Sequence, residues 1–300
     1  MQNFYLPVIF LQLVIITYLS FIIVDVRWEI RSGFKTQERL TIQNEELENL
    51  VSPWIAKRHH DVEVDHDSVA WKLNPTKEEL HRMRAYYYAN VEMIDNQVGN
   101  ILNSLEERGN MDNTIVIFTS DHGDNLGDHG LIQKWAPYEE VTRVPLIISA
   151  PKRFKSGRTI NAMVQLFDLA PTILEWSGVK PNPTFEAISF NPALEGEQFD
   201  GRDHVFCEQA GDVNMTGASY LTMVRSHTHK LVHFHGSEEG QLFDLSSNDS
   251  ETKNLWDDPT SLNVKQSLLQ RMLEFYIEST VQTRDARRLI VSPANAKAMQ

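Results

Sequence analysis

Hydrophobic side chains recur over residues 80–105 at the spacing of one helical face. Intervals of three, four and seven residues place on a common side Leu80, Met83, Tyr87, Ile94, Val98, Ile101 and Leu105. Before this stripe, Thr76 and Glu79 form a capping box, in which each side chain accepts a free backbone N–H. After it, Gly109 provides a C-terminal stop. The pattern predicts a long, well-buried helix between Thr76 and Gly109.

A continuous apolar run follows the predicted helix. Residues 114–119, Thr-Ile-Val-Ile-Phe-Thr, have the length and β-branched content of a strand that is covered on both faces. Because a helix followed by a buried strand is typical of α/β proteins, we expect an α/β fold with a parallel or mixed sheet. After Ser261, a second helical pattern predicts a packing helix through Val264, Leu268, Leu269, Met272, Leu273 and Tyr276. Residues from Arg284 onward are expected to form a loose tail.

The apolar N-terminal segment permits two interpretations. Residues 4–24 carry no charge and have the length of a helix that spans a bilayer, about 20 residues. This length predicts a membrane association through the segment, and hence a membrane-anchored or exported protein. Pro7, Gln12 and the many β-branched residues also suit a buried core strand, and in that case a cytoplasmic location is expected.

Composition excludes one class of partner. The 300 residues are 41% hydrophobic and 23% charged, as in a globular protein with a sizeable core. The formal net charge of -13 leaves no basic excess to displace counterions from a phosphate backbone, so we expect no nucleic-acid partner. Cys207 is the only cysteine, which excludes an intrachain disulfide.

The loop after the predicted strand holds potential metal ligands. Asp121-His122-Gly123 follows residues 114–119 almost directly, and in open α/β sheets ligands gather at the carboxyl ends of strands. A carboxylate beside an imidazole suits a divalent cation, and the glycine allows the backbone to turn sharply. The alternative is a glycine-rich turn whose aspartates cap the next element. We interpret Asp121 and His122 as a metal-binding pair.

Several stretches in a fixed order carry a resemblance to a known family. Residues 86–135, which include FTSDHGDNLGDHGLIQKW, are followed by RVPLIISAP, LFDLAPTILEWSGV, MVRSHTHKLVHF and QLFDLSSNDSETKNL. From Pro75 to Leu255 this series resembles the later half of the catalytic domain of the sulfatases, within the alkaline phosphatase superfamily. The resemblance implies an α/β fold of alkaline phosphatase type, incomplete at its N-terminal side, with a small α+β C-terminal subdomain built on an antiparallel sheet.

The resemblance also implies roles for single residues. Asp121 and His122 match the pair that binds the active-site divalent cation, most often calcium, with manganese or magnesium as alternatives. Lys134 matches the lysine that holds the sulfate oxygens and neutralises charge on the leaving ester. His129 is a candidate proton donor or substrate contact, and Arg225 is a candidate substrate contact at the rim of the site.

Four histidines invite a second metal hypothesis. On a strand, residues two apart share a face, so two pairs form from His227, His229, His233 and His235. No carboxylate recurs at a matching spacing, and the resemblance implies a β-hairpin in this region. We therefore favour a structural or substrate-rim role for these histidines over metal binding.

The family's nucleophile is a formylglycine made from Cys or Ser in a (C/S)xPxR motif. Cys207 in VFCEQAG does not fit, nor do Ser52 and Ser292, so the sequence predicts no nucleophile and no formylglycine in this chain. Cys207 is expected to be a buried thiol on a strand. The acidic pair that opens other members is also missing, unless Asp25, after an apolar run, is its remnant.

These observations predict a domain organisation and a function. We expect an apolar N-terminal segment (1–28), a polar connection (29–75), the later half of a sulfatase-like α/β domain (76–200), and a C-terminal subdomain with its helix (201–300). The function implied is metal-dependent hydrolysis of sulfate esters, with sulfated small molecules or glycans as partners. The alternatives are an inactive fragment or non-catalytic binding protein, and a phosphatase or phosphodiesterase of the same superfamily.

Overall fold

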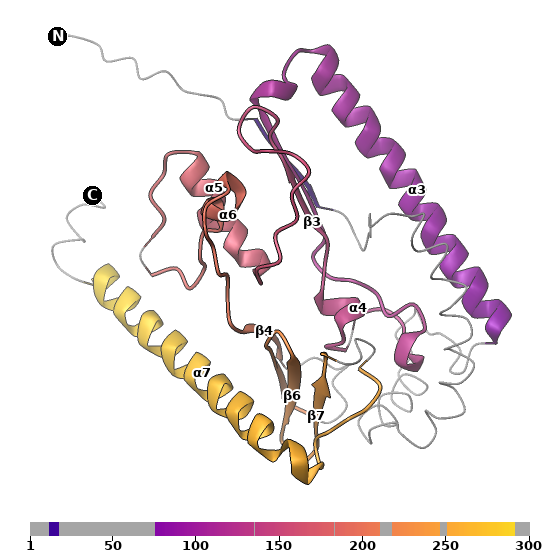
Figure 1. Ribbon diagram of the computed structural model, residues 1–300, viewed down its shortest axis with the longest axis vertical. Helices are drawn as coiled ribbons and strands as arrows, with labels where there is room; N and C mark the ends of the chain where they lie inside the picture. Colours follow the sequence, from indigo (N-terminus) through magenta and orange to yellow (C-terminus); the bar gives the residue numbers. More distant parts are fainter. Residues whose placement is uncertain are drawn as a thin grey trace.

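The computed structural model describes residues 12–17, 76–134, 136–182, 184–210, 218–246 and 251–291. These residues form two β-sheets with helices around them (Figure 1). The long helices α3 (Lys77–Glu107) and α7 (Leu262–Val291) lie on opposite sides of the molecule. The short helix α4 (Glu139–Thr142) lies between the sheets. The predicted α/β class is confirmed.

The first sheet has the strand order β1 (Gln12–Thr17), β2 (Thr114–Thr119), β3 (Leu146–Ser149). β1 runs parallel to β2 and β3 runs antiparallel to it, so the sheet is mixed. β2 is the strand predicted from the apolar run, and all of its residues except Val116 are buried. Its central position between two other strands explains that burial.

β1 takes up part of the apolar N-terminal segment. The register pairs Gln12 with Thr114 and Thr17 with Thr119, so β1 and β2 end at the same edge of the sheet. Asp25, the predicted remnant of an acidic opening, lies outside the described residues. None of the helices in the described part of the chain has the length and apolar character needed to cross a membrane. The membrane anchor therefore stays a prediction.

One face of the first sheet packs against two short helices, α5 (Leu169–Trp176) and α6 (Asn191–Glu195). The core of this layer consists of Ile115, Ile117, Ala150, Phe154, Trp176, Phe190 and Leu194. Before α5, the 3-10 turn η3 (Leu166–Asp168) ends at a buried carboxylate, and Arg202 Nε donates to Asp168 Oδ2 at 2.9 Å. This ion pair fixes the chain that leaves the first sheet for the second.

Helix α3 begins with the predicted capping box. Thr76 Oγ1 accepts the Glu79 N–H at 3.2 Å, and Glu79 Oε2 accepts the Thr76 N–H at 2.8 Å. The helix ends before Gly109, whose φ is +65°, as predicted. The predicted burial is wrong: no residue of α3 is buried, and Ile101 is 40% exposed. The apolar stripe has helical spacing, but none of the described elements covers it completely. A single 3-10 turn, η1 (Met111–Asn113), connects the helix to β2.

The second sheet is antiparallel throughout, as the resemblance implied. Its strands are β4 (Val205–Ala210), β5 (Tyr220–Arg225), β6 (His229–His235) and β7 (Gly240–Asp244), in that order. One face packs on α7, through Val224, Leu231, Leu242, Leu268 and Met272. The other face packs on the segment between β2 and α4, through Leu131, Ala136, Tyr138, Met223, Val232, Phe234 and Phe243. The second sheet is thus in direct contact with the loop that follows β2.

Helix α7 is the predicted packing helix, with two corrections. Leu268 and Met272 are buried, whereas Leu273 is 59% exposed. The helix continues past Arg284 to Val291, where a loose tail was expected. The turn η4 (Pro259–Ser261) precedes it, and Asp258 Oδ1 accepts the Thr260 N–H at 2.9 Å. The buried residues Leu268 and Met272 lie in the first half of the helix, which continues well beyond them.

The histidines of β6 have a structural setting. His229, His233 and His235 lie on one strand at alternate positions, while His227 lies in the turn before it. Within the described residues, none of these histidines belongs to a group of three potential metal ligands. Burial lowers the pKa of His233, and the neighbouring His235 lowers it further. This setting favours the structural interpretation.

Candidate metal centre

The loop after β2 brings Asp121 and His122 together at the carboxyl edge of the first sheet. His122 Nε2 lies 3.5 Å from Asp121 Oδ2, and Asp121 Oδ1 accepts the backbone N–H of His122 at 3.0 Å. The Asp121 side chain is 65% exposed and that of His122 is 21% exposed. The two side chains therefore meet at an edge that is open to solvent.

The hydrogen bond of His122 Nδ1 determines which ring nitrogen has a free lone pair in the neutral imidazole. His122 Nδ1 lies 2.8 Å from the Gly123 carbonyl oxygen, which can only accept, so Nδ1 carries the proton. In the neutral ring, Nε2 then holds the lone pair, and this atom is buried without a hydrogen-bond partner. A lone pair and a carboxylate oxygen 3.5 Å apart repel each other unless a cation or a proton lies between them. The pair therefore fits a divalent cation, with a backbone carbonyl that orients the imidazole.

Gly123 seats this loop on α4. Its N–H donates to the Val141 carbonyl oxygen at 2.8 Å. A Cβ at Gly123 would lie 1.8 Å from the Glu140 carbonyl oxygen. Because the obstructing atom belongs to the backbone, it cannot rotate away, and only glycine allows this approach.

Substitution of Gly123 tests this contact between the loop and α4. We expect Gly123→Ala to lower the free energy of unfolding by about 1–3 kcal/mol, because the loop must move off α4. Gly99→Ala is the matched control, since Gly99 lies in α3 with no atom within 4 Å of the added Cβ. That change is expected to stabilise the helix by about 0.5–1 kcal/mol. Urea unfolding of both variants measures the difference in the free energy of unfolding. Equal effects would contradict the close contact between Gly123 and α4.

Lys134 lies at the far end of the same loop and is exposed. The residue before it is tied back to the start of the loop. Gln133 N donates to Asp124 Oδ1 at 3.0 Å, and the Gln133 carbonyl accepts Asn125 Nδ2 at 2.7 Å. These bonds bring both ends of the loop together, so the predicted sulfate-binding lysine and the predicted cation pair belong to one structural unit.

Backbone strain and a second anchor mark the middle of the loop. Leu126, His129 and Gln133 have positive φ angles of 48°, 54° and 62°, a conformation that costs energy in residues other than glycine and clusters at functional sites. From α3, Arg84 Nε donates to the Leu126 carbonyl at 2.9 Å, and its Nη2 donates to Asp128 Oδ1 at 3.0 Å. Burial raises the pKa of Asp128, and the Arg84 guanidinium opposes that rise.

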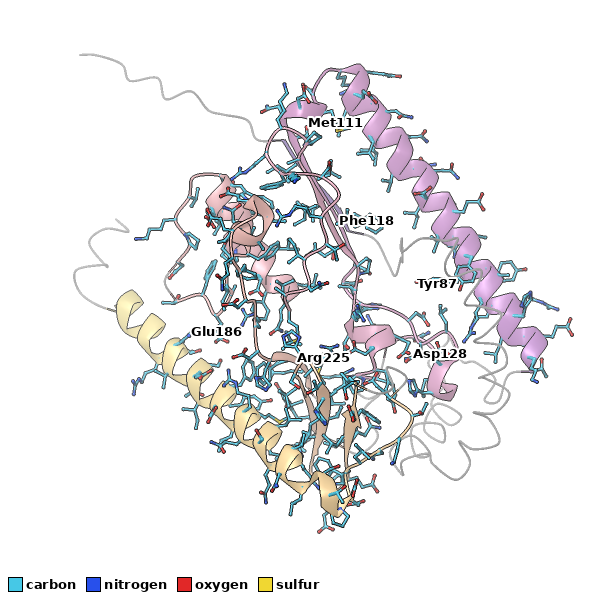
Figure 2. All side chains as sticks on the ribbon, viewed as in Figure 1. Tyr87, Met111, Phe118, Asp128, Glu186 and Arg225 are labelled. Carbon is cyan, nitrogen blue, oxygen red and sulfur yellow. The ribbon has the colours of Figure 1, made fainter. Side chains whose placement is uncertain are left out.

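Asp128 and Arg225 lie on either side of α4 in Figure 2.

His129 is a core residue of the loop. Its side chain is 5% exposed, and Nε2 lies 3.5 Å from Glu140 Oε2. Its ring stacks on Tyr138, with centroids 3.7 Å apart. A proton donor or substrate contact needs an accessible ring, so this placement argues against the role predicted for His129. Neither Glu140 nor Tyr138 could be predicted as a partner of His129, because only the folded loop brings them to the imidazole.

Arg225 belongs to a buried ion network that the sequence did not reveal. Glu139 Oε1 lies 3.0 Å from Arg225 Nε and 2.9 Å from Lys230 Nζ. Lys230 Nζ also lies 2.7 Å from Glu251 Oε1, and neither of these two side chains is exposed. Glu251 Oε2 accepts the Glu139 N–H at 2.7 Å. Burial alone would raise the pKa of Glu139, but the Lys230 ammonium and the Arg225 guanidinium outweigh it and lower the pKa. The predicted substrate contact of Arg225 thus competes with a structural role.

One further group of potential ligands adjoins this network. Ligand atoms of His129, Glu140 and Glu251 lie within 4.8 Å of one another. The ammonium of Lys230 already lies 2.7 Å from Glu251 Oε1, and it would repel a divalent ion placed among these ligands. The Lys230 ammonium thus already supplies positive charge to this group, and Asp121 and His122 remain the predicted metal ligands.

The buried glutamates predict a dependence of stability on pH. Burial raises the pKa of Glu251 from its usual 4.5, although Lys230 opposes the rise. Glu251 therefore contributes stability below pH 4.5 that is lost as pH rises through its folded pKa, whereas Glu139, with its lowered pKa, contributes stability above pH 4.5 that is lost as pH falls. In urea unfolding, we expect Glu251→Gln to become more stable relative to the unmodified chain as pH rises from 4.5 to about 8. A difference that stays constant over this range would contradict the assignment.

The candidate nucleophiles are Cys207 and a serine of the first sheet. Cys207 lies on a strand, β4, as predicted, but it is only partly buried, and burial raises its pKa, which disfavours the reactive thiolate. The sequence prediction overlooked Ser149, in Ser-Ala-Pro-Lys-Arg, which satisfies the (C/S)xPxR spacing. Ser149 pairs with Val116, toward the edge of the sheet opposite Asp121, about 16 Å away at the usual rise per strand residue. Arg153 of this motif pairs with Glu195 at 3.8 Å. The prediction that this chain has no (C/S)xPxR motif is therefore wrong, although the strand register places Ser149 away from Asp121.

Comparison with known proteins assigns the family. Residues 36–179 match the family model described as Sulfatase, and residues 127–278 match the model described as N-sulphoglucosamine sulphohydrolase, C-terminal. The chain belongs to the sulfatase family. An N-acetylglucosamine-6-O-sulfatase of Bacteroides thetaiotaomicron is 33% identical over 192 residues, which are 63% of this chain and 34% of that protein. The order of motifs from Pro75 to Leu255 had indicated the same family.

Solved structures agree with this assignment. An enzyme solved in complex with its substrate D-glucosamine-2-N,6-O-disulfate has a TM-score of 0.60 and 31% identity, and the match covers 65% of this chain and 40% of that one. A phosphonate monoester hydrolase from Silicibacter pomeroyi has a TM-score of 0.67 and 26% identity, with 76% and 49% covered. The chain thus spans between about a third and a half of the length of these sulfatases and their structural neighbours.

Proposed function

We propose that this chain supplies the cation-binding and sulfate-binding part of a sulfuric ester hydrolase. The observation that carries the proposal is that His122 Nε2 lies 3.5 Å from Asp121 Oδ2 at the carboxyl edge of β2, while the Gly123 carbonyl holds His122 Nδ1. Sulfatase relatives and the family models over residues 36–278 support it. The serine of the (C/S)xPxR stretch, Ser149, pairs with Val116 away from this pair, so the reaction would require a different nucleophile beside it.

Asp121 and His122 would hold the divalent ion, and calcium is the proposed metal because the resemblance to the sulfatases implies it. When bound, such an ion acts as a Lewis acid on an ester oxygen. Lys134 would place its ammonium against the sulfate oxygens and stabilise charge that develops on them. The bonds from Gln133 to Asp124 and Asn125 would keep Lys134 oriented toward the same edge.

The proposed substrate class is a sulfated sugar or small aryl sulfate ester. A structural neighbour was solved with a doubly sulfated glucosamine as its substrate, and a relative is named an N-acetylglucosamine-6-O-sulfatase. A sulfate monoester carries one negative charge, which the lysine and a bound cation can balance together. The site thus suits an anionic ester at an open edge of the sheet.

A phosphonate or phosphate ester is the second candidate substrate. The phosphonate monoester hydrolase from Silicibacter pomeroyi matches a larger share of this chain than the structure that was solved with the sulfated glucosamine. Tetrahedral sulfate and phosphonate esters present similar oxygens to a lysine and a cation, so the described residues favour neither strongly. Turnover must distinguish the two.

Hydrolysis of 4-nitrophenyl sulfate, 4-nitrophenyl phosphate and a phenylphosphonate ester by the full chain in calcium tests the proposal. If the chain hydrolyses the sulfate ester, we expect the turnover to require the metal and to fall at least about 100-fold in Lys134→Met. The control is Lys180→Met, which removes an exposed lysine beyond α5. Faster turnover of the phosphonate would support the second candidate. No turnover of any ester by folded, calcium-binding protein would support a non-catalytic binding protein.

A further inference from the structure

We propose that Glu139 is a positioning residue for the cation site, which it serves by locking the C-terminal sheet to the loop that carries His122. This inference rests on the proposed function, since it concerns the same pair of ligands. Glu139 touches neither the cation pair nor, in the proposed reaction, the ester. It acts through a continuous series of hydrogen bonds that crosses from the second sheet to the first.

The series begins with three residues of the C-terminal part that hold Glu139. Arg225 Nε and Lys230 Nζ lie 3.0 Å and 2.9 Å from Glu139 Oε1. Glu251 Oε2 accepts the Glu139 backbone N–H at 2.7 Å. Both the side chain and the main chain of Glu139 are therefore fixed, and Lys230, which has no exposed side-chain surface, allows little movement.

Helix α4 carries this constraint to the first sheet. It is a single turn, in which Val141 N donates to the Tyr138 carbonyl at 3.0 Å and Arg143 N donates to the Glu139 carbonyl at 2.9 Å. The Val141 carbonyl then accepts Gly123 N at 2.8 Å. Because Gly123 approaches α4 too closely for a Cβ, a shift of the helix displaces the loop as well.

The last bond of the series reaches the proposed metal ligand. The Gly123 carbonyl accepts a hydrogen bond from His122 Nδ1 at 2.8 Å, which orients the ring so that Nε2 lies beside Asp121. A group that orients a histidine ligand in this way governs both its tautomer and its direction. The other anchor of the loop, Arg84, bonds to residues 126 and 128, so it does not fix the His122 ring.

Glu139→Ala tests this inference. The substitution does not leave the buried Lys230 unpaired, because Lys230 keeps Glu251 and the Pro137 carbonyl as partners. Glu139→Gln keeps an acceptor oxygen in the same place and is the conservative variant. Asp168→Ala is the matched control, since it removes a buried carboxylate that pairs with Arg202 but makes no bond to α4. Each variant is studied as the full chain, at a temperature where thermal melting shows it folded.

Two measurements separate a positioning role from a structural one. By calorimetric titration with calcium, we expect Glu139→Ala to weaken binding about 10-fold or more and Glu139→Gln to restore most of the affinity. By ¹⁵N NMR without metal, we expect the His122 ring, assigned with His122→Gln, to lose its pure Nδ1–H form in Glu139→Ala. Asp168→Ala should change neither quantity, even where it lowers the melting temperature as much.

The outcomes distinguish failure of this inference from failure of the proposed function. If the unmodified chain binds no calcium while its His122 ring responds to Glu139→Ala, the positioning stands and the metal site fails. If the chain binds calcium and Glu139→Ala alters neither affinity nor tautomer, the positioning role is overturned. Equal effects of Glu139→Ala and Asp168→Ala on both quantities would also overturn it, because general destabilisation would then explain them.

Discussion

Lys230→Met is expected to destabilise the protein by about 3–5 kcal/mol, the largest effect of any single substitution considered for this chain. The Lys230 side chain has no exposed surface, and its ammonium lies 2.9 Å from Glu139 Oε1 and 2.7 Å from Glu251 Oε1. Methionine fills similar space but leaves two buried carboxylates without this counter-ion. Urea unfolding at neutral pH measures the loss.

A surface lysine with the same ion-pair distance provides the control. Lys152 Nζ lies 2.7 Å from Asp112 Oδ2, but the two side chains are 69% and 56% exposed. Water screens this pair, so Lys152→Met should cost less than about 1 kcal/mol. If both substitutions cost the same, burial of the Lys230 network does not stabilise the contact between the second sheet and α4.

The second large effect concerns the cation. We expect His122→Ala to weaken calcium binding at least about 100-fold, since loss of a ligand should cost no less than loss of a group that merely orients one. Asp121→Asn should act similarly, because it removes the charge of the hard ligand. The His122 side chain is 21% exposed and lies outside the hydrophobic clusters, so the fold should tolerate its removal. Calorimetric titration with calcium measures both variants.

His235→Ala is the matched control for the ligand substitution. His235 is an exposed histidine at the end of β6, and its loss should leave the affinity for calcium unchanged. An unchanged affinity of His122→Ala for calcium would contradict the assignment of the cation to this loop. The group of His129, Glu140 and Glu251 would then need a direct test with Glu140→Gln, despite the ammonium beside it.

The two sheets of this protein cooperate at one short helix. On one side of α4, Arg225 and Lys230 of the second sheet form ion pairs with Glu139. On the other side, the Val141 carbonyl accepts the N–H of Gly123, in the loop that carries Asp121 and His122. The loop is held separately from α3 through Arg84. Two parts of the chain that are distant in sequence, α3 and the second sheet, and the adjacent helix α4 thus converge on the segment from Asp121 to Lys134. This convergence explains why a loop with several strained residues can keep one conformation.

Sequence alone determined the features that depend on near neighbours. The capping box of Thr76 and Glu79 joins residues three apart, the apolar run of residues 114–119 is itself a buried strand, and Asp121 and His122 are covalently adjacent. Local hydrogen bonding and periodicity suffice for such features. The ordered motifs also indicated the family, which the family models confirm.

Tertiary structure alone decided which groups meet across the chain. Glu139 and Glu251 are 112 positions apart, and no periodicity in the sequence links them to Lys230. The burial of His129, the incomplete cover of α3 and the position of Ser149 away from Asp121 likewise depend on which surfaces pack together. Packing and strand pairing at long separation follow from the three-dimensional arrangement of whole elements, and that arrangement is not written in the local pattern of any one of them.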